Sequence, residues 1–272
     1  MAIKLMYITN NIQVAEIADS AGVDRIFIDL EIVGKKLRQA NRDTVISDHS
    51  IDDINKVKSV LKNAEVLVRT NPIHFGSEKE LNAVAESNAD VMMLPYFTTA
   101  LEVKAFINYI GGRKRTCLLF ETPESIKNAE EILELDGIDE VFIGLNDLHM
   151  GYGMKFMFEL LADGTVDRMC KLFKQRNIPY GFGGIARLNQ GTLKANIILG
   201  EHYRLGSECV ILSRSFCNLS RMTSMEQVRL TMEDGVKEIR EHEAFLATAD
   251  DLYFNENREK LIECVNIIKS SL

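Results

Sequence analysis

Two short stretches decide the fold of this chain: Leu118-Leu119-Phe120-Glu121-Thr122-Pro123-Glu124 and Val141-Phe142-Ile143-Gly144-Leu145-Asn146-Asp147-Leu148. Each is an apolar run of strand length that ends in a carboxylate, Glu121 in the first stretch and Asp147 in the second. The two acids are 26 residues apart, and the sequence between them is predicted to form one helix. The pair therefore predicts two parallel strands that are joined by a helical crossover.

The same spacing recurs towards the N-terminus. Pro95 lies 26 residues before Glu121 and follows the apolar run 91–94, and Arg69 lies another 26 residues back, after the run 66–68. Four successive strands are therefore expected to end at matching positions, with an arginine and two acids at their ends. A parallel barrel places these strand ends on one face, where active sites are built. Two carboxylates and an arginine on that face predict a divalent metal beside a site for an anionic substrate.

Strand and helix patterns alternate along the rest of the chain. Eight strands are predicted, at residues 3–8, 25–31, 66–69, 91–95, 116–121, 140–143, 179–182 and 209–212. Most of them are followed by a helical pattern, as a (β/α)8 TIM barrel requires. The alternative is a doubly wound open sheet, which usually has a glycine-rich first turn, but residues 7–11 contain no glycine. We therefore predict a single barrel domain over residues 1–272.

The C-terminal part is longer than the closing helix of a barrel. Residues 225–246 have the pattern of a long amphipathic helix, and residues 255–268 predict a last helix. On a lone barrel, the first of these helices is expected to expose apolar side chains, namely Val228, Leu230, Met232 and Phe245. Because a second subunit would bury them, residues 225–272 are expected to form contacts in a homo-oligomer.

Composition narrows the class of function. The net charge of −8 argues against a nucleic-acid partner, which normally selects a basic surface. Five cysteines are scattered without a CxxC motif, which favours reduced thiols in a cytoplasmic protein. No apolar stretch of about 18 residues predicts a membrane span. These features favour a small-molecule partner, since one local arginine can bind an anion on an acidic protein.

The candidate site residues each have a second interpretation. Glu121 and Asp147 are predicted metal ligands, although acids after strands also cap helices or pair with lysines. Arg69 offers a planar fork that binds a carboxylate through two hydrogen bonds. The alternative role of Arg69 is an ion pair with Glu31 or Glu121. Of Asp29 and Glu31, only one is expected to face the barrel interior.

Histidines supply further candidates for proton transfer. His49 and His149 are expected on loops after the second and sixth strands, on the active face. His74 and His202 are expected in loops after the third and seventh strands, and His242 is expected to be solvated. Histidine ordinarily titrates near neutral pH, so His49, His149, His74 and His202 are each expected to be able to serve as an acid or base. A surface role is the alternative for each loop histidine.

Six segments of the sequence resemble the HpcH/HpaI aldolase family, which also contains the citrate lyase beta subunit. They are residues 21–31, 67–69, 93–100, 120–124, 142–148 and 205–210. The resemblance covers roughly residues 1–220. It implies a (β/α)8 barrel, in a hexamer or trimer whose last helix is often exchanged between partners. It also implies a Mg²⁺ or Mn²⁺ site at Glu121 and Asp147, with Arg69 holding the carboxylate end of the substrate.

The activity implied by the resemblance is that of a metal-dependent carbon–carbon lyase of the aldolase type. Such an enzyme acts on a 2-oxo acid through a metal-stabilised enolate. Two positions depart from the family pattern. Ile32 stands where the aldolases carry a catalytic histidine, and Leu119 stands where they commonly carry a glutamine.

The loss of the family histidine leaves the proton-transfer residue open. His49 is the candidate replacement, because residues 46–50 belong to the loop that normally supplies the base. Asp48 is a possible orienting neighbour of His49. The alternative function is a barrel with reduced catalysis that binds a small carboxylate as a sensor or scaffold. A smaller possibility is a hydrolase or a phosphoenolpyruvate-using enzyme on the same metal site.

Overall fold

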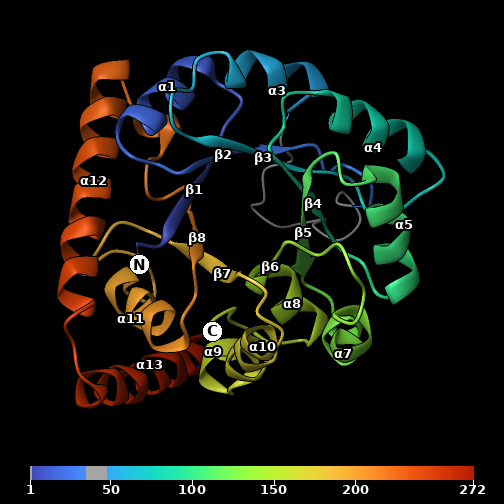
Figure 1. The fold of residues 1–272 in the computed structure, drawn as a ribbon. Coiled ribbons are helices and arrows are strands. Elements are labelled where there is room, and N and C mark those ends of the chain that lie inside the picture. The colour runs from blue at the N-terminus through green and yellow to red at the C-terminus, as the bar shows by residue number, and fades with distance from the viewer. Residues whose placement is uncertain (1, 35–47) are drawn as a thin grey trace.

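Eight parallel strands form a closed barrel surrounded by helices, in a computed structural model that describes residues 2–34 and 48–272 (Figure 1). Neighbouring strands follow the chain order, and β1 closes the barrel by pairing with β8. The predicted (β/α)8 TIM barrel is confirmed. The strands are β1 Lys4–Ile8, β2 Arg25–Asp29, β3 Glu65–Arg69, β4 Val91–Leu94, β5 Arg115–Phe120, β6 Glu140–Ile143, β7 Tyr180–Ile185 and β8 Cys209–Leu212.

The helices follow the strands with local signals that explain their ends. Thr99 caps α5 by accepting a hydrogen bond from the Glu102 N–H, and Gly111 ends it in the left-handed conformation at φ 58°. The helices are α1 Ile12–Ser20, α3 Ile51–Lys58, α4 Ser77–Glu86, α5 Ala100–Ile110, α6 Pro123–Lys127, α7 Ala129–Ile132, α8 Leu145–Gly151, α9 Glu159–Ala162, α10 Thr165–Gln175, α11 Ala195–Leu205, α12 Met225–Leu246 and α13 Asp251–Ser271.

The crossover between β5 and β6 differs from the prediction of one helix. It contains two short helices, α6 and α7, which are separated by Asn128. The backbone of Asn128 is not helical, with φ −95° and ψ 11°, and its side-chain amide donates to the carbonyl oxygen of Thr98 at 2.9 Å. This contact with the preceding connection breaks a pattern that looks continuous in the sequence.

Alternate residues of a strand face the same side, and the residues that face the barrel interior form three layers. At the amino ends of the strands, buried Arg25 lies 2.9 Å from Glu65 and 2.7 Å from Glu140. Two residues further along each strand, apolar side chains such as Phe27 and Leu67 fill the middle. The next inward positions form the third layer at the carboxyl ends. We call this layer, together with the loops that follow it, the barrel mouth.

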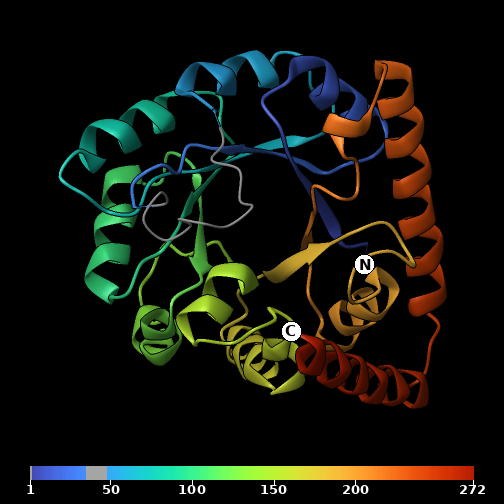
Figure 2. The ribbon, with the colours of Figure 1, turned by 180° about the vertical axis from the view of Figure 1, so that it is seen from behind.

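Helix α12 occupies the place of the eighth barrel helix, between α1 and α11, and α13 lies outside α11 and α9 (Figures 1 and 2). The predicted exposure of Val228 and Met232 is therefore wrong, because both are fully buried within their own chain. Leu230 and Phe245 are exposed, as expected. The amphipathic pattern was correct, but α1 of the same chain covers its apolar face.

The last helix rests on its own barrel through buried polar contacts. Helix α13 starts earlier than predicted, because the Asp250 side chain caps it by accepting from the Tyr253 N–H. The Asn257 amide donates to the Ile197 carbonyl at 3.0 Å and to the buried Glu201 at 3.2 Å. In this structure of one chain the last helix packs on its own barrel, and the homo-oligomer stays a prediction.

Two further sequence expectations concern thiols and membranes. All five cysteines have free thiols, and four of them are buried. Among the helices within residues 2–34 and 48–272, none combines the length and the apolar character that crossing a membrane requires.

Candidate active site

Arg69 and Asp29 form the centre of the barrel mouth. They lie opposite each other in the register of β3 and β2. The Arg69 Nε and Nη2 atoms both donate to the Asp29 carboxylate at 2.9 Å, and Nη1 lies 3.4 Å from Glu31 Oε2. Only 2% of Asp29 and 0% of Glu31 is exposed. The expectation that only one of these acids faces inward is wrong, because residues two apart on an extended chain share a face.

Arg69 is a permanent cation at this position. Burial acts to lower the pKa of its guanidinium, but the charges of Asp29, Glu31 and Glu121 outweigh burial and raise that pKa above its ordinary value. The guanidinium also lies 5.6 Å from the centre of the Phe27 ring, over the apolar middle layer. Its plane is therefore fixed by contacts on several sides.

Glu121 follows β5 directly and is almost fully buried. Its Oε1 atom accepts a hydrogen bond from the Tyr96 backbone N–H at 3.1 Å. Its Oε2 atom lies beside Gly144, where an added Cβ would come within 2.7 Å of that oxygen. The carboxylate is thus held between the connections that follow β4 and β6.

Asp147 does not end a strand, contrary to the prediction. Strand β6 ends at Ile143, and Asp147 lies in the first turn of α8, where a negative charge is favoured by the helix dipole. Its Oδ1 atom is buried and receives no hydrogen bond from the described residues. Because Gly144 contacts Glu121 just before α8 begins, both candidate ligands belong to this side of the barrel mouth.

The donor set fits a hard divalent cation. Glu121 and Asp147 offer carboxylate oxygens on one side of the barrel mouth, and the buried Oδ1 atom of Asp147 has no hydrogen-bond partner among the described residues. Oxygen ligands are those that Mg²⁺ and Mn²⁺ select. Within the described ranges, no group of three or more His, Cys, Asp and Glu side chains is placed so that it could hold a metal ion. Glu121 and Asp147 would therefore supply two ligands and leave other positions for water and substrate.

His49 lies beside the Arg69–Asp29 pair. Its Nδ1 atom accepts a hydrogen bond from the Asp29 backbone N–H at 2.9 Å. Residues 46 and 47 of its predicted loop lie outside the described residues. Because Nδ1 acts as an acceptor, a neutral ring carries its proton on Nε2. In this conformation His49 offers a donor, and it must release the Asp29 amide before Nε2 can act as a base.

Two other histidines differ from their predicted positions on the active face. His149 lies within α8 and its Nδ1 atom is 3.2 Å from the Leu145 carbonyl oxygen, which makes it part of the helix rather than a loop. His202 lies within α11, with its ring stacked on Phe182 at 3.8 Å, and burial lowers its pKa to about 3. His202 is therefore a neutral core residue.

The remaining two histidines lie away from the Arg69–Asp29 pair. His242 is partly buried and stacks on Phe245, and burial lowers its pKa, so the prediction that it is solvated is wrong. His74 follows β3, as predicted, and its Nδ1 atom lies 3.0 Å from the Pro72 carbonyl oxygen and from the Ser77 hydroxyl. Both histidines are explained by local packing.

The two departures from the family pattern are visible in the structure. Ile32 exposes 56% of its surface, and its backbone N–H donates to the Asn71 side chain at 2.8 Å. Leu119 belongs to the apolar middle layer. Neither position supplies a polar group for proton transfer, so the chemistry depends on other residues of the barrel mouth.

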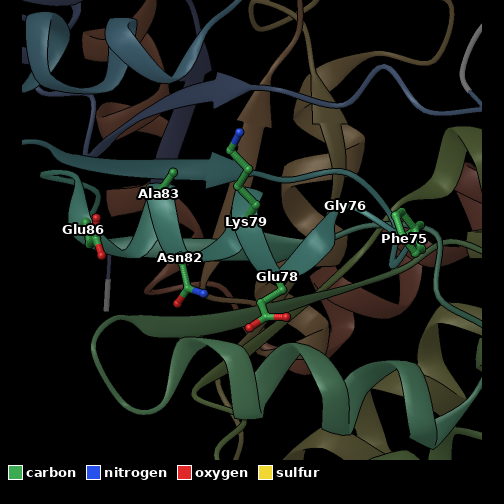
Figure 3. Close-up of a pocket in the computed structure, with 7 residues that line it drawn as sticks. All are labelled: Phe75, Gly76, Glu78, Lys79, Asn82, Ala83 and Glu86. Carbon is green, nitrogen blue, oxygen red and sulfur yellow. The ribbon is translucent and has the colours of Figure 1, made fainter.

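The hollow in Figure 3 is separate from the barrel mouth. It runs along the outer face of α4 and is lined by Phe75, Gly76, Glu78, Lys79, Asn82, Ala83 and Glu86. None of these side chains belongs to the set described above, and their charges have mixed signs. We therefore place the candidate active site at the barrel mouth.

Sequence reasoning missed two residues of this site and left a third undecided. Asp29 was named as an alternative to Glu31, although strand alternation gives it the same parity as Phe27 and Glu31. Tyr96 contacts Glu121 through its backbone, which no side-chain pattern reveals. Gly144 stands in a quoted motif, but the sequence does not show that a carboxylate needs its missing side chain.

Comparisons with known proteins agree with this architecture. A model of the HpcH/HpaI aldolase/citrate lyase family matches residues 4–158. An HpcH/HpaI aldolase structure from Desulfitobacterium hafniense DCB-2 has a TM-score of 0.60 at 15% identity and covers 88% of this chain and 93% of its own. An HpcH/HpaI aldolase/citrate lyase family structure from Burkholderia cenocepacia J2315 has a TM-score of 0.61 at 14% identity, with 84% and 95% covered.

At such low identity, the two structures show a shared fold alone. Among curated proteins, none matches the sequence significantly. The family model, however, spans more than half of the chain and includes Arg69, Glu121 and Asp147. The chain therefore belongs to the HpcH/HpaI aldolase/citrate lyase family.

Proposed function

We propose that the protein is a metal-dependent carbon–carbon lyase of the aldolase type that acts on a 2-oxo acid. The observation that carries the proposal is the buried Oδ1 atom of Asp147, which has no hydrogen-bond partner among the described residues. Asp147 lies in the first turn of α8, directly after the Gly144 that contacts Glu121. Membership of a family of aldolases and lyases supports an enzymatic role.

Arg69 is the proposed anchor for the substrate carboxylate. A guanidinium has five N–H donors, and Asp29 uses two of them. The other donors serve Glu31 and an incoming carboxylate. Asp29 holds the guanidinium plane before substrate arrives, which reduces the entropy lost on binding.

Glu121 and Asp147 are the proposed ligands of Mg²⁺ or Mn²⁺. When bound there, such a metal would polarise the 2-oxo group and stabilise the negative charge that develops as the carbon–carbon bond breaks. The Tyr96 N–H donates to the Glu121 carboxylate, and Asp147 lies in the first turn of α8, where the helix dipole favours a negative charge.

His49 is the proposed proton-transfer residue. Its Nδ1 atom accepts from the Asp29 amide, so Nε2 is the ring nitrogen that we propose for proton transfer. In the neutral ring Nε2 holds a proton and can donate a hydrogen bond to the reacting oxygen. Accepting a proton requires the ring to exchange tautomers and give up the Asp29 contact.

The metal assignment is tested by Mn²⁺ binding, measured by electron paramagnetic resonance, in Glu121→Gln and Asp147→Asn. Each substitution removes a charge from the site and is expected to weaken Mn²⁺ binding while the protein stays folded. Glu226→Gln is the control, because Glu226 is exposed on α12 and pairs with Arg229. If both site variants bind Mn²⁺ as the parent does, the assignment is wrong.

Catalysis is tested separately by following exchange of the pyruvate methyl protons with deuterated water by NMR. The proposed lyase should accelerate this exchange in a Mn²⁺-dependent manner, because enolate formation releases a methyl proton. The alternative is a barrel with reduced catalysis that binds a small carboxylate, which is favoured by the exposed Ile32 at the family's histidine position. That protein would bind Mn²⁺ and pyruvate without accelerating exchange.

A further inference from the structure

Tyr96 has an unusual backbone conformation next to the proposed metal ligand. Among the described residues, three non-glycine residues have positive φ: Tyr96 at 50°, Asn177 at 54° and Asn189 at 61°. Asparagine adopts the left-handed region comparatively often, whereas tyrosine pays a steric cost there. Strain of this kind persists where the surrounding structure requires it.

The Tyr96 conformation serves a contact with Glu121. Strand β4 ends at Leu94, and two residues later the Tyr96 N–H donates to Glu121 Oε1 at 3.1 Å. The contact is made by the backbone, so it depends on the conformation of residue 96 and not on the tyrosine ring. A residue that resists the left-handed region would move this N–H.

Gly144 contacts the other oxygen of the same carboxylate. Its φ of −84° is open to any residue, so the backbone does not require glycine here. A Cβ at this position would lie 2.7 Å from Glu121 Oε2 and 2.8 Å from Glu121 Cβ. The missing side chain therefore gives Glu121 its space.

We propose that Tyr96 and Gly144 are positioning residues that together fix the orientation of the Glu121 carboxylate for metal binding. Tyr96 acts through its left-handed backbone and its N–H, and Gly144 acts through the absence of a Cβ. This inference rests on the proposed metal function of Glu121. Its consequence is that substitutions at residues 96 and 144, which do not themselves bind the metal, should change metal affinity.

The role of Tyr96 is tested by Tyr96→Gly, Tyr96→Asn and Tyr96→Val, with Mn²⁺ alone as the probe. Glycine and asparagine tolerate positive φ and keep the N–H, so Mn²⁺ affinity should stay within about twofold of the parent. Valine is β-branched and resists this region, so affinity should fall by about tenfold. Asn177→Val is the matched control, because it strains a similar φ away from the barrel mouth and should lower only the melting temperature.

The role of Gly144 is tested by Gly144→Ala. Displacement of the Glu121 carboxylate should weaken Mn²⁺ binding by about tenfold in a protein that remains folded. Gly200→Ala is the matched control. Gly200 lies on α11, and a Cβ at this position would lie 2.6 Å from Asn257 Nδ2. That variant has a steric conflict of similar severity and should bind Mn²⁺ as the parent does.

The outcomes separate this inference from the proposed function. If Glu121→Gln weakens Mn²⁺ binding but Tyr96→Val and Gly144→Ala do not, the positioning roles are wrong and the metal assignment stands. If Tyr96→Gly weakens binding as much as Tyr96→Val, the tyrosine side chain is responsible and the backbone role is wrong. If the parent does not bind Mn²⁺, both proposals are overturned.

Discussion

Replacing Arg69 with lysine should lower the unfolding free energy and weaken substrate binding, because the same guanidinium pairs with Asp29 and is the proposed anchor of the substrate carboxylate. The substitution keeps the positive charge but removes the fork that reaches Asp29 through Nε and Nη2, each at 2.9 Å. An ammonium can retain one of these contacts. Asp29 and Glu31 are buried, so the lost contact is not replaced by bulk water.

The expected magnitude follows from the number of contacts. Losing one charge-assisted hydrogen bond costs about 1.5–3 kcal/mol in unfolding free energy. For a domain of this size the melting temperature should fall by about 3–5 °C. Arg69→Met removes the positive charge that pairs with the two buried carboxylates, so the unfolding free energy should fall by about 3–5 kcal/mol. In the presence of Mn²⁺, pyruvate binding to Arg69→Lys should weaken by about 10–150-fold.

The measurements are thermal unfolding by circular dichroism and pyruvate titration by calorimetry. Arg115→Lys is the matched control, because Arg115 pairs with Glu65 at the opposite end of the barrel and both side chains are more than a third exposed. An exposed pair contributes about 0–1 kcal/mol, so the control should unfold close to the parent temperature. An unchanged melting temperature in Arg69→Met would refute the reasoning about the buried pair. Parent-like pyruvate binding in Arg69→Lys would show that Arg69 does not anchor the substrate.

Three further predictions concern proton transfer, acid stability and assembly. His49→Ala should lower turnover by about 100-fold or more. Compared with His49→Ala, His49→Asn should restore the melting temperature, because its amide oxygen can accept from the Asp29 N–H, but it should not restore turnover. Recovery of turnover in His49→Asn would assign His49 a structural role. Burial lowers the pKa of His202 from its ordinary value of 6.5 to about 3 in the folded protein. Below pH 6.5 the unfolded chain therefore binds a proton at this histidine that the folded chain does not bind, and the unfolding free energy falls. His202→Phe should remove about 2 kcal/mol of the stability lost between about pH 7 and 5 in denaturant titrations, and an unchanged loss would contradict this assignment. Light scattering should give a mass above the 30.7 kDa of one chain, since Leu230 and Phe245 remain exposed, and a monomer at micromolar concentration would contradict the homo-oligomer.

The strands could be predicted from the sequence because each is a short apolar run bounded by turn residues. The predicted bounds of β6 and β8 agree with the structure at both ends. The break in the crossover between β5 and β6 could not be predicted in this way, because the apolar spacing of Ile126, Ala129 and Ile132 continues across Asn128. A contact of Asn128 with the Thr98 carbonyl, distant in sequence, decides that the helix breaks.

The residues of the candidate site also divide into those that the sequence could place and those that it could not. Strand alternation is enough to place Arg69 and Glu121 at the barrel mouth, and it should also have placed Asp29 there. Asp147 lay beyond this rule, because Gly144 ends the strand and the acid falls in the first turn of α8. The left-handed conformation of Tyr96 depends on the closure of the loop against Glu121, and no property of a tyrosine side chain predicts it.

The arginines at the two ends of the barrel interior differ in what they leave available to a ligand. At the amino ends of the strands, ion pairs join two arginines, Arg25 and Arg115, to two glutamates, Glu65 and Glu140. That set is balanced, so it can stabilise the fold without a ligand. At the carboxyl ends, Asp29 occupies two of the five N–H donors of Arg69, whose side chain remains 14% exposed. A guanidinium held in this way can bind a second carboxylate, which supports placing the proposed substrate site at this end of the barrel.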